Sequence, residues 1–582
     1  MDSPLQEQGH ARGMTGRSIS KMRLLLVLAL LALTVASWLP RFRGPLDLRW
    51  DAGSYYVLGT SLAEGRGYRL LNEPGQIEAI QYPPLLPCIV AVHQWILGTS
   101  DPILVGRWLR LSFFLMFTIY ILSAYTLLER FLPAGWACVS VVMCLLHLFA
   151  MFLSDVLFAE LPFALASVLF MLCHGKNGSR IYPVLSGACA ILTYLLRTAG
   201  IALLIAWVGE SLLKRDFKRA ALRFAVALLP VLGWQSYIAH VQASAVYTLP
   251  SYPYQRADYL FYNVSYVTNL SLRDPLRPEL GKVSLRDVGK RIVHNTLRIP
   301  QSLGEAVSTD RAYWQGLVLG RLPGARHVPD RIGYTGVTVF LAFLGALTLG
   351  GVVVQMARRQ WVVALYIMAY IGAVCLTPWP LQWRRYWSPL APFLVLALLQ
   401  CLLTLRDCLQ RAVPLPTRVV VAFFPAAVVG LILVVESLTV LEAYKTTRGE
   451  AVLHDRQGRP VHVELFFYGQ PNRALDEALA WLRVHAQPTD AVATAMPHWA
   501  YLVTHMTTVM PPFESDPEKA QALLDAVPVR YIVMDSTDVD VSHLMRRRTW
   551  PVLRGVPSRW TEVYADPAGL VAIYERAQRE SM

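Results

Sequence analysis

The chain has 582 residues, of which 54% are hydrophobic and only 16% are charged, and its mean hydropathy is +0.39. This composition is too apolar for an ordinary soluble protein and predicts a protein that crosses a membrane many times. Residues 441–582 carry 15 Lys and Arg against 18 Asp and Glu, a net charge of −3. Because the whole chain has a net charge of +14, residues 1–440 have a net charge of +17. Because the water-soluble part is the acidic one, nucleic acid is excluded as a partner.

The first 20 residues are polar and are expected to form a disordered cytoplasmic N-terminus. Lys21 and Arg23 precede an apolar run at 24–39, and no small-residue cleavage site follows it, which predicts an uncleaved first span. Ten further windows have the length and apolarity of membrane spans. They lie at 107–127, 134–153, 156–173, 181–196, 198–213, 222–240, 334–355, 361–378, 387–405 and 418–440.

One shorter apolar window, at 85–97, is predicted not to cross. It has about 13 residues, with His93 and Gln94 in the middle, which indicates an interfacial or re-entrant helix. With this choice, the basic cluster at 214–219 falls in the cytoplasm, as the positive-inside rule requires. We therefore predict eleven spans, with the N-terminus inside and the C-terminal domain outside.

Three segments are then expected outside the membrane, at 40–106, 241–333 and 441–582. The second is rich in Tyr and Arg and contains an amphipathic stretch near 288–303 that is expected to lie on the membrane surface. The third alternates helix and strand patterns, which favours a small α/β domain. Its predicted helices are at 473–485 and 520–526, and its predicted strands are at 491–495, 530–534 and 570–574.

Cysteines and histidines provide no metal or disulfide pattern. The eight cysteines lie in or near apolar segments, the last 140 or so residues have none, and no CxxC pair occurs. His93, His240 and His294 stand singly, without ligand spacing.

Four polar clusters lie where apolar runs meet the predicted outer face, around Asp51, Asp155, Arg197 and the pair Arg384 and Arg385. Charged residues at such positions are costly and indicate function. Each also has a structural interpretation: Asp51 as a helix cap, Asp155 as a cap or the partner of an arginine, and Arg197 and Arg384 as helix ends that snorkel to the interface. The adjacent arginine pair runs against the positive-inside rule, which favours function there.

These motifs, in this order, resemble the GT-C superfamily of polytopic glycosyltransferases, which includes protein O-mannosyltransferases and lipid A aminoarabinose transferases. Asp51 with 62–68 is similar to the first external loop of that superfamily, and 82–85 to the entry of its juxtamembrane helix. The segments 154–158 and 196–198 resemble its second external loop and its arginine turn, and Arg385-Tyr386 with Pro389 and Pro392 resembles its Arg-Tyr-x-x-Pro-x-x-Pro segment.

The sequence departs from the superfamily pattern in three places. Ser54 stands where members often have a second carboxylate, and Thr198-Ala199 lacks the usual proline. Gln81 and Tyr82 occupy the region where some members bind a metal through a glutamate, and Glu78 is the nearest acid. No cofactor is assigned, and a divalent metal stays open.

The resemblance implies a fold of about eleven transmembrane helices, at 21–440, with a C-terminal extracytoplasmic α/β domain at 441–582. It implies transfer of a sugar from a polyprenyl-phosphate donor to a protein, lipid or glycan acceptor at the outer face of a cell membrane, such as the bacterial inner membrane. The catalytic residue of the family's first loop corresponds to Asp51.

One carboxylate is enough as general base for this chemistry, because a phosphate leaving group needs little protonation; inversion follows. Asp51 is the predicted base, and Asp155 is predicted to orient the acceptor or the arginines. Arg197, Arg384 and Arg385 are predicted to bind the donor phosphate. The substrate-lining residues are predicted to be Tyr55, Glu78, Tyr82 and Tyr386, with Trp50, Trp383 and Trp387. A lipid or sugar transporter or flippase is the alternative, and a membrane scaffold is a third reading.

Overall fold

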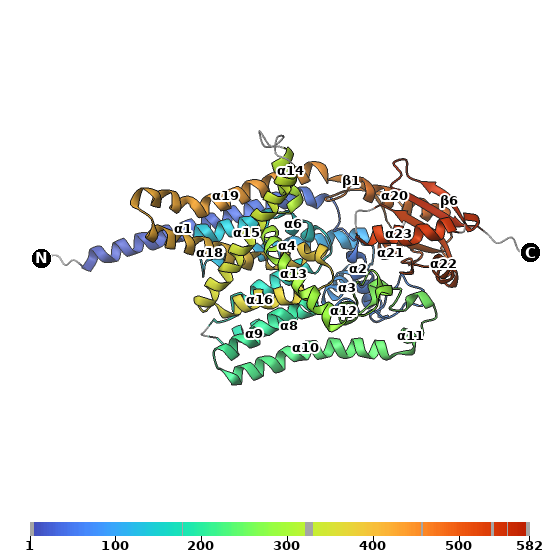
Figure 1. The fold of residues 1–582 in the computed structure, drawn as a ribbon, viewed down its shortest axis with the longest axis horizontal. Coiled ribbons are helices and arrows are strands. Elements are labelled where there is room, and N and C mark those ends of the chain that lie inside the picture. Colours follow the sequence, from blue (N-terminus) through green and yellow to red (C-terminus); the bar gives the residue numbers. More distant parts are fainter. Residues whose placement is uncertain are drawn as a thin grey trace, which may run out of the picture.

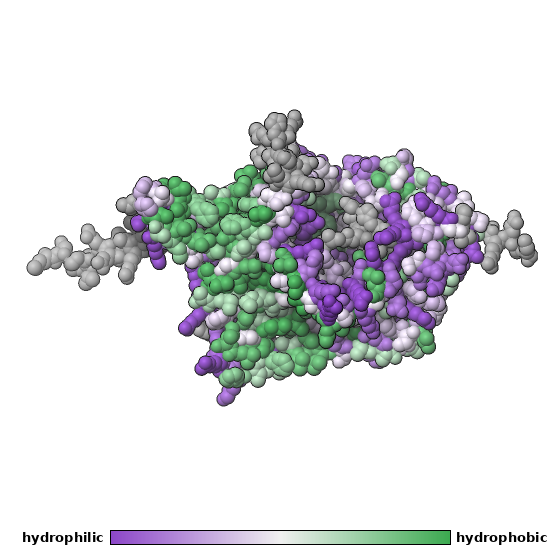
Figure 2. Space-filling view, viewed as in Figure 1, coloured by the Kyte–Doolittle hydropathy of each residue, from purple (hydrophilic) through white to green (hydrophobic). Residues whose placement is uncertain are grey.

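The computed structural model describes residues 5–176, 179–320, 330–455, 458–536, 540–555 and 557–577. A helical body and a smaller domain with strands lie at opposite ends of the long axis (Figure 1). Figure 2 shows hydrophobic side chains over the helical body and mostly hydrophilic ones over the other end. This division is the one that the charge and hydropathy of the sequence predict.

Six helical stretches of the described residues are long and apolar enough to cross a membrane. The helices that make up most of each stretch are α1 (Leu5–Trp38), α4 (Pro102–Leu128), α10 (Phe217–Ala243), α15 (Asp330–Ala357), α18 (Ala391–Ala412) and α19 (Leu415–Thr446). A seventh candidate is the pair α5 (Ala134–Leu146) and α6 (Leu148–Asp155), which is bent by 59° at His147.

Four shorter apolar helices complete the predicted set: α7 (Glu160–Cys173), α8 (Ile181–Leu196), α9 (Ile201–Leu213) and α16 (Trp361–Leu376). Every one of the eleven predicted segments is therefore helical, which confirms the helical membrane fold. The window at 85–97 forms a separate helix, α3 (Leu85–Leu97), which ends at Gly98 in the left-handed conformation. Sidedness stays a prediction.

The two predicted outer loops contain helices of their own. The first contains α2 (Asp51–Ala63) and α3. The second contains α11 (Ala245–Thr248), α12 (Tyr266–Ser271), α13 (Leu285–Ala306) and α14 (Arg311–Gly320). The predicted amphipathic stretch corresponds to α13, which starts with a capping box between Ser284 and Asp287. Helix α13 packs so closely on α15 that a Cβ atom at Gly304 or Gly345 would collide with the backbone of the opposing helix.

The C-terminal domain is α/β, as predicted. A five-stranded sheet has the order β4-β3-β5-β7-β6 and mixes parallel and antiparallel pairs. The strands are β3 (Ala491–Thr494), β4 (Thr507–Val509), β5 (Val529–Asp535), β6 (Trp560–Ala565) and β7 (Val571–Arg576). The helices are α20 (Gln470–His485), α21 (Pro497–Thr504), α22 (Pro517–Ala526) and α23 (Asp540–Gly555). An antiparallel pair, β1 (Gly449–His454) with β2 (Pro460–Leu465), precedes them and was not predicted, nor were β4 and β6.

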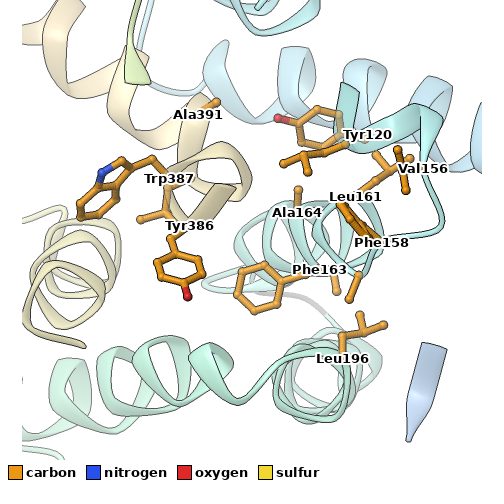
Figure 3. Close-up of a cluster of buried hydrophobic side chains, with 14 of the residues drawn as sticks. Tyr120, Val156, Phe158, Leu161, Phe163, Ala164, Leu196, Tyr386, Trp387 and Ala391 are labelled. Atoms are coloured by element: carbon orange, nitrogen blue, oxygen red, sulfur yellow. The ribbon is translucent and has the colours of Figure 1, made fainter. Parts of the chain in front are cut away.

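A continuous apolar core joins the helical body to the segment that carries the polar motifs. Figure 3 shows Phe158, Leu161 and Phe163, at the start of α7, in one cluster with Tyr386 and Trp387 of α17 (Trp383–Trp387). All five side chains are at most 5% exposed. Because close packing fixes both backbones, the charged residues next to these anchors are held in fixed positions.

Candidate active site

Four charged side chains from distant parts of the chain meet at one point, here called the charged centre: Asp51, Glu160, Arg197 and Arg385. Arg385 joins the two carboxylates, since its Nη1 lies 2.5 Å from Asp51 Oδ2 and its Nε donates to Glu160 Oε1. Arg197 donates to the same Glu160 oxygen. The centre holds two positive and two negative charges and is neutral as a whole.

Helix ends position each member of the charged centre. Asp51 is the first residue of α2, and Glu160 is the first residue of α7, where the helix dipole favours a carboxylate. Arg197 follows the last residue of α8, and Arg385 lies in the short helix α17. Trp50, before Asp51, has a positive φ of 57°, which is strained for a bulky side chain, and such strain often occurs at functional sites.

The four side chains of the charged centre differ in their exposure to solvent: Glu160 is buried, and the other three are partly exposed. Glu160 is 1% exposed, whereas Arg197 is 12%, Arg385 is 16% and Asp51 is 35% exposed at their side chains. The second oxygen of Glu160 has no hydrogen-bond partner among the described residues. A buried carboxylate that holds two guanidinium groups side by side keeps both ready for an anionic ligand.

Aromatic side chains surround the centre. The Arg385 guanidinium lies over Phe158, 4.1 Å from the ring centroid, and Arg197 lies over Tyr386 at 5.6 Å. Tyr82 lies near Asp51 and helps to lower the pKa of its carboxyl group, and the Tyr82 ring lies 4.8 Å from that of Tyr55. Of the predicted lining residues, Tyr55, Tyr82 and Tyr386 are thus brought to the charged centre.

The neighbouring charges set the protonation of Asp51. Desolvation raises the pKa of this carboxyl, but the charge and hydrogen bond of Arg385 outweigh it and bring the pKa below its ordinary value. Tyr82 and Arg197 act in the same direction. Burial also raises the pKa of Tyr55 to about 12, so this phenol is neutral at physiological pH. Asp51 is therefore an ionised acceptor of hydrogen bonds, and it is a weak base while Arg385 stays on it.

Asp155 pairs with two arginines that are not part of the charged centre. Its Oδ1 accepts hydrogen bonds from Arg41, at 2.9 Å, and from Arg110, and all three side chains are at most 2% exposed. Each arginine also donates to a backbone carbonyl, Arg41 to Met151 and Arg110 to Pro45. This second cluster, here called the buried ion triad, fits the interpretation of Asp155 as the partner of an arginine.

Two other predicted site residues lie away from the charged centre. Arg384 pairs with Asp310, so the adjacent arginines of α17 point to different partners. Glu78 lies 3.7 Å from Arg69 and is about one-third exposed, with its backbone carbonyl bonded to Asn263. Neither makes a hydrogen bond to Asp51 or Glu160 among the contacts of the described residues.

Sequence reasoning missed Glu160 and two contacts from the C-terminal domain. Glu160 lies two residues after the 154–158 motif and is an acid at the start of an apolar helix, which was the available signal. His498 lies 3.1 Å from Ser54 Oγ, and Arg49, fully buried, pairs with Asp476 at 2.9 Å. These contacts hold the chain on both sides of Asp51, and no local sequence pattern predicts them. Burial lowers the pKa of His498 to about 3, so its ring is neutral.

A resident metal was left open by the sequence. Within the described residues, no group of three or more His, Cys, Asp or Glu side chains is placed to hold an ion. The two carboxylates of the charged centre are bridged by Arg385, so a cation would have to displace that guanidinium. The donor set found here does not fit a metal, and no step below depends on one.

Comparison with known proteins identifies the fold. No protein-family model matches the chain, and no curated protein matches its sequence. Among solved structures, the oligosaccharyltransferase AglB of Archaeoglobus fulgidus, determined with an inhibitory peptide and a dolichol-phosphate, aligns with a TM-score of 0.52 and 14% identity over 96% of this chain and 75% of AglB.

Two further solved structures align over most of this chain with lower scores. ArnT of Cupriavidus metallidurans, bound to undecaprenyl phosphate, has a TM-score of 0.38 and 12% identity over 95% of this chain and 97% of ArnT. The mycobacterial arabinofuranosyltransferase AftD has a TM-score of 0.37 and 16% identity over 95% of this chain and 40% of AftD. The chain has the fold of the GT-C glycosyltransferases: a polytopic helical body with an appended C-terminal domain.

Proposed function

We propose that this chain is an integral membrane glycosyltransferase that moves a sugar from a polyprenyl-phosphate donor to an acceptor at the outer face of the membrane. The observation that carries the proposal is the charged centre. Two arginines are held together by one buried carboxylate, next to an accessible aspartate, within the GT-C fold. Paired guanidinium groups suit a phosphate, and the aspartate suits a proton acceptor.

Arg197 and Arg385 bind the donor phosphate in this proposal. In the ligand-free state, the charges of the two arginines are balanced by those of Asp51 and Glu160. A phosphate must therefore compete with Asp51 for Arg385. Glu160, buried and bonded to both arginines, keeps them in place while Arg385 turns to the phosphate. The bilayer supplies the isoprenoid chain, and the tyrosines Tyr55, Tyr82 and Tyr386 line the path of the sugar.

Donor binding also activates the base. The pKa of Asp51 lies below its ordinary value because Arg385 pairs with it. When the phosphate takes this guanidinium, Asp51 loses its main cation and becomes a stronger base. The acceptor hydroxyl gives its proton to Asp51, its oxygen bonds to the anomeric carbon, and the bond from that carbon to the phosphate oxygen breaks. The electron pair leaves with the phosphate, whose charge the arginines stabilise, and the configuration inverts.

The transfer assay tests this function. Membranes that contain the wild-type chain should move label from a radiolabelled polyprenyl-phosphate sugar to an endogenous acceptor, and membranes with Asp51→Asn should not. The exposed carboxylate variant Glu477→Gln is the matched control and should transfer like wild type. If label crosses the bilayer on intact donor, and Asp51→Asn has no effect on this movement, the chain is a flippase and the proposal is wrong.

A further inference from the structure

Beside the charged centre lies a pocket of about 240 Å³ that none of the steps above uses. Its walls come from the start of α6, the end of α13, the residues before α14, the short helix α17 and Phe467, which follows β2. Arg384 lines the pocket, whereas its neighbour Arg385 belongs to the charged centre. The two adjacent arginines therefore belong to two different sites.

One aromatic side chain separates this pocket from the charged centre. Phe152 lines the pocket, and its ring lies 5.5 Å from Trp50, the residue before Asp51. The same ring lies 6.3 Å from Phe158, on which the Arg385 guanidinium rests. Phe152 thus contacts both the residue before Asp51 and the ring under Arg385, so a ligand in the pocket lies one aromatic side chain away from the charged centre.

The polar groups of the pocket argue against two ligands. Asp310 already neutralises Arg384, and Glu305 adds a further carboxyl group, so the pocket offers no net positive charge to a phosphate. Much of the lining is apolar, but an isoprenoid tail would also desolvate Glu305 and the ion pair without replacing their hydrogen bonds. The charges of the pocket therefore disfavour both the phosphate and the lipid tail of the donor.

The same lining suits a sugar ring. Phe149, Phe152 and Phe467 present apolar ring surfaces, against which the C–H face of a sugar packs. Asp310 and Glu305 accept hydrogen bonds from hydroxyl groups, and Arg384 donates them. A serine or threonine side chain would leave most of the 240 Å³ unfilled.

We propose that this pocket binds the acceptor and that the acceptor ends in a sugar, so that the enzyme extends a glycan or glycolipid. The inference rests on the proposed function and specifies its acceptor. The acceptor sugar packs on Phe152, hydrogen-bonds to Asp310, Glu305 and Arg384, and directs one hydroxyl past Trp50 to Asp51.

Saturation-transfer difference NMR tests the pocket without the donor. The probes are methyl glycosides of glucose, galactose and mannose, added singly to purified full-length protein in detergent. At least one should receive saturation on the C–H protons of one ring face. Asp310→Asn and Glu305→Gln should each weaken its Kd about tenfold or more, because each removes a charge-assisted hydrogen bond. Glu477→Gln, an exposed match, should bind like wild type.

The outcomes separate this inference from the proposed function. Asp51→Asn should keep the glycoside signal while it loses transfer. If no glycoside binds to the wild type, or binding survives Asp310→Asn and Glu305→Gln in proteins that elute and melt normally, the inference is wrong. A serine-containing peptide that binds in place of the glycosides also overturns it. Glycoside binding in the pocket without any transfer from polyprenyl-phosphate sugars would instead contradict the proposed function.

Discussion

The charged centre and the buried ion triad are built from the same groups, yet their surroundings differ. In the triad, Asp155 and both arginines are sealed from solvent, and spare donors of Arg41 and Arg110 go to backbone carbonyls. In the charged centre, Asp51 is 35% exposed, and Arg385 donates to the two carboxylates rather than to a backbone carbonyl among the described residues. Arg41 Nη1, Arg110 Nε and Asp155 Oδ2 of the triad also have no hydrogen-bond partner among the described residues. Access from solvent, rather than residue type or unused hydrogen-bonding groups, is therefore what separates the two clusters.

The triad nevertheless supports the centre. The backbone of Asp47 bonds to that of Asp155 and of Leu157, so the chain that leads to Asp51 is tied to the start of the 156–160 segment. Arg49 extends this anchor to Asp476 in the C-terminal domain. The triad and Arg49 thus fix the backbone on the N-terminal side of Asp51, whereas the proposed function requires Arg385 to change partners.

The largest difference between the two clusters is expected when the carboxylates of Asp51 and Asp155 are removed one at a time. Asp51→Asn should lower the rate of transfer by about 10² to 10⁴, because the amide keeps the shape of the side chain but cannot accept the proton. Its melting temperature should stay within a degree or two of wild type. Transfer assays and thermal unfolding of the purified variant measure both quantities. A variant that retains more than about a tenth of wild-type activity would move the base elsewhere.

Asp155→Ala should have the opposite profile. It leaves two buried guanidinium groups without a counter-charge, which typically costs about 3 to 5 kcal/mol of folding free energy. The expected result is a large loss of folded protein and a lower melting temperature. The folded remainder should transfer sugar at a rate close to wild type per molecule. Full stability together with lost transfer would place Asp155 in the active site, as the sequence alone allowed.

The adjacent residues Arg384 and Arg385 of α17 allow the same kind of comparison within one helix. Arg385→Ala should lower kcat/KM for the donor about tenfold to 150-fold, the equivalent of about 1.5 to 3 kcal/mol for a charge-assisted hydrogen bond. Arg385→Lys should recover only part of this loss, because it keeps the charge without the planar fork. Arg384→Ala should leave the donor KM unchanged and raise the acceptor KM. Equal donor defects in both variants would contradict the separation of their roles.

Glu73 provides a third case, a buried carboxylate without an arginine. Tyr254 and Gln255 donate to it, and burial raises its pKa to about 7. Because this pKa is above that of the unfolded chain, about 4.3 for glutamate, the protonated form stabilises the fold at low pH. That contribution should fall as the pH rises from about 4.5 to 7 and then level off. Thermal unfolding between pH 4.5 and 8 should show this slope, and Glu73→Gln should reduce it.

The sequence predicted the helical segments and three members of the charged centre, because charges between apolar runs are conspicuous. It could not separate Arg384 from Arg385, since adjacent residues on a helix point in different directions and only tertiary packing decides what each one meets. It could not find the partners of Asp155, because Arg41 is 114 residues away and Arg110 looked like part of a span. Glu160 stood beside the Asp155 motif in the sequence but received no role, because only tertiary packing shows that it meets both Arg197 and Arg385.

The central claim is that Arg197 and Arg385 form a phosphate site that draws Arg385 from Asp51. ³¹P NMR of a short-chain polyprenyl phosphate, titrated with the purified full-length protein, tests it most directly. The wild type and Arg384→Ala should shift and broaden the phosphate resonance with the same Kd, whereas Arg197→Ala and Arg385→Ala should weaken that Kd about tenfold or more. A Kd that is unchanged in Arg197→Ala and Arg385→Ala, but weakened in Arg384→Ala, would contradict the account.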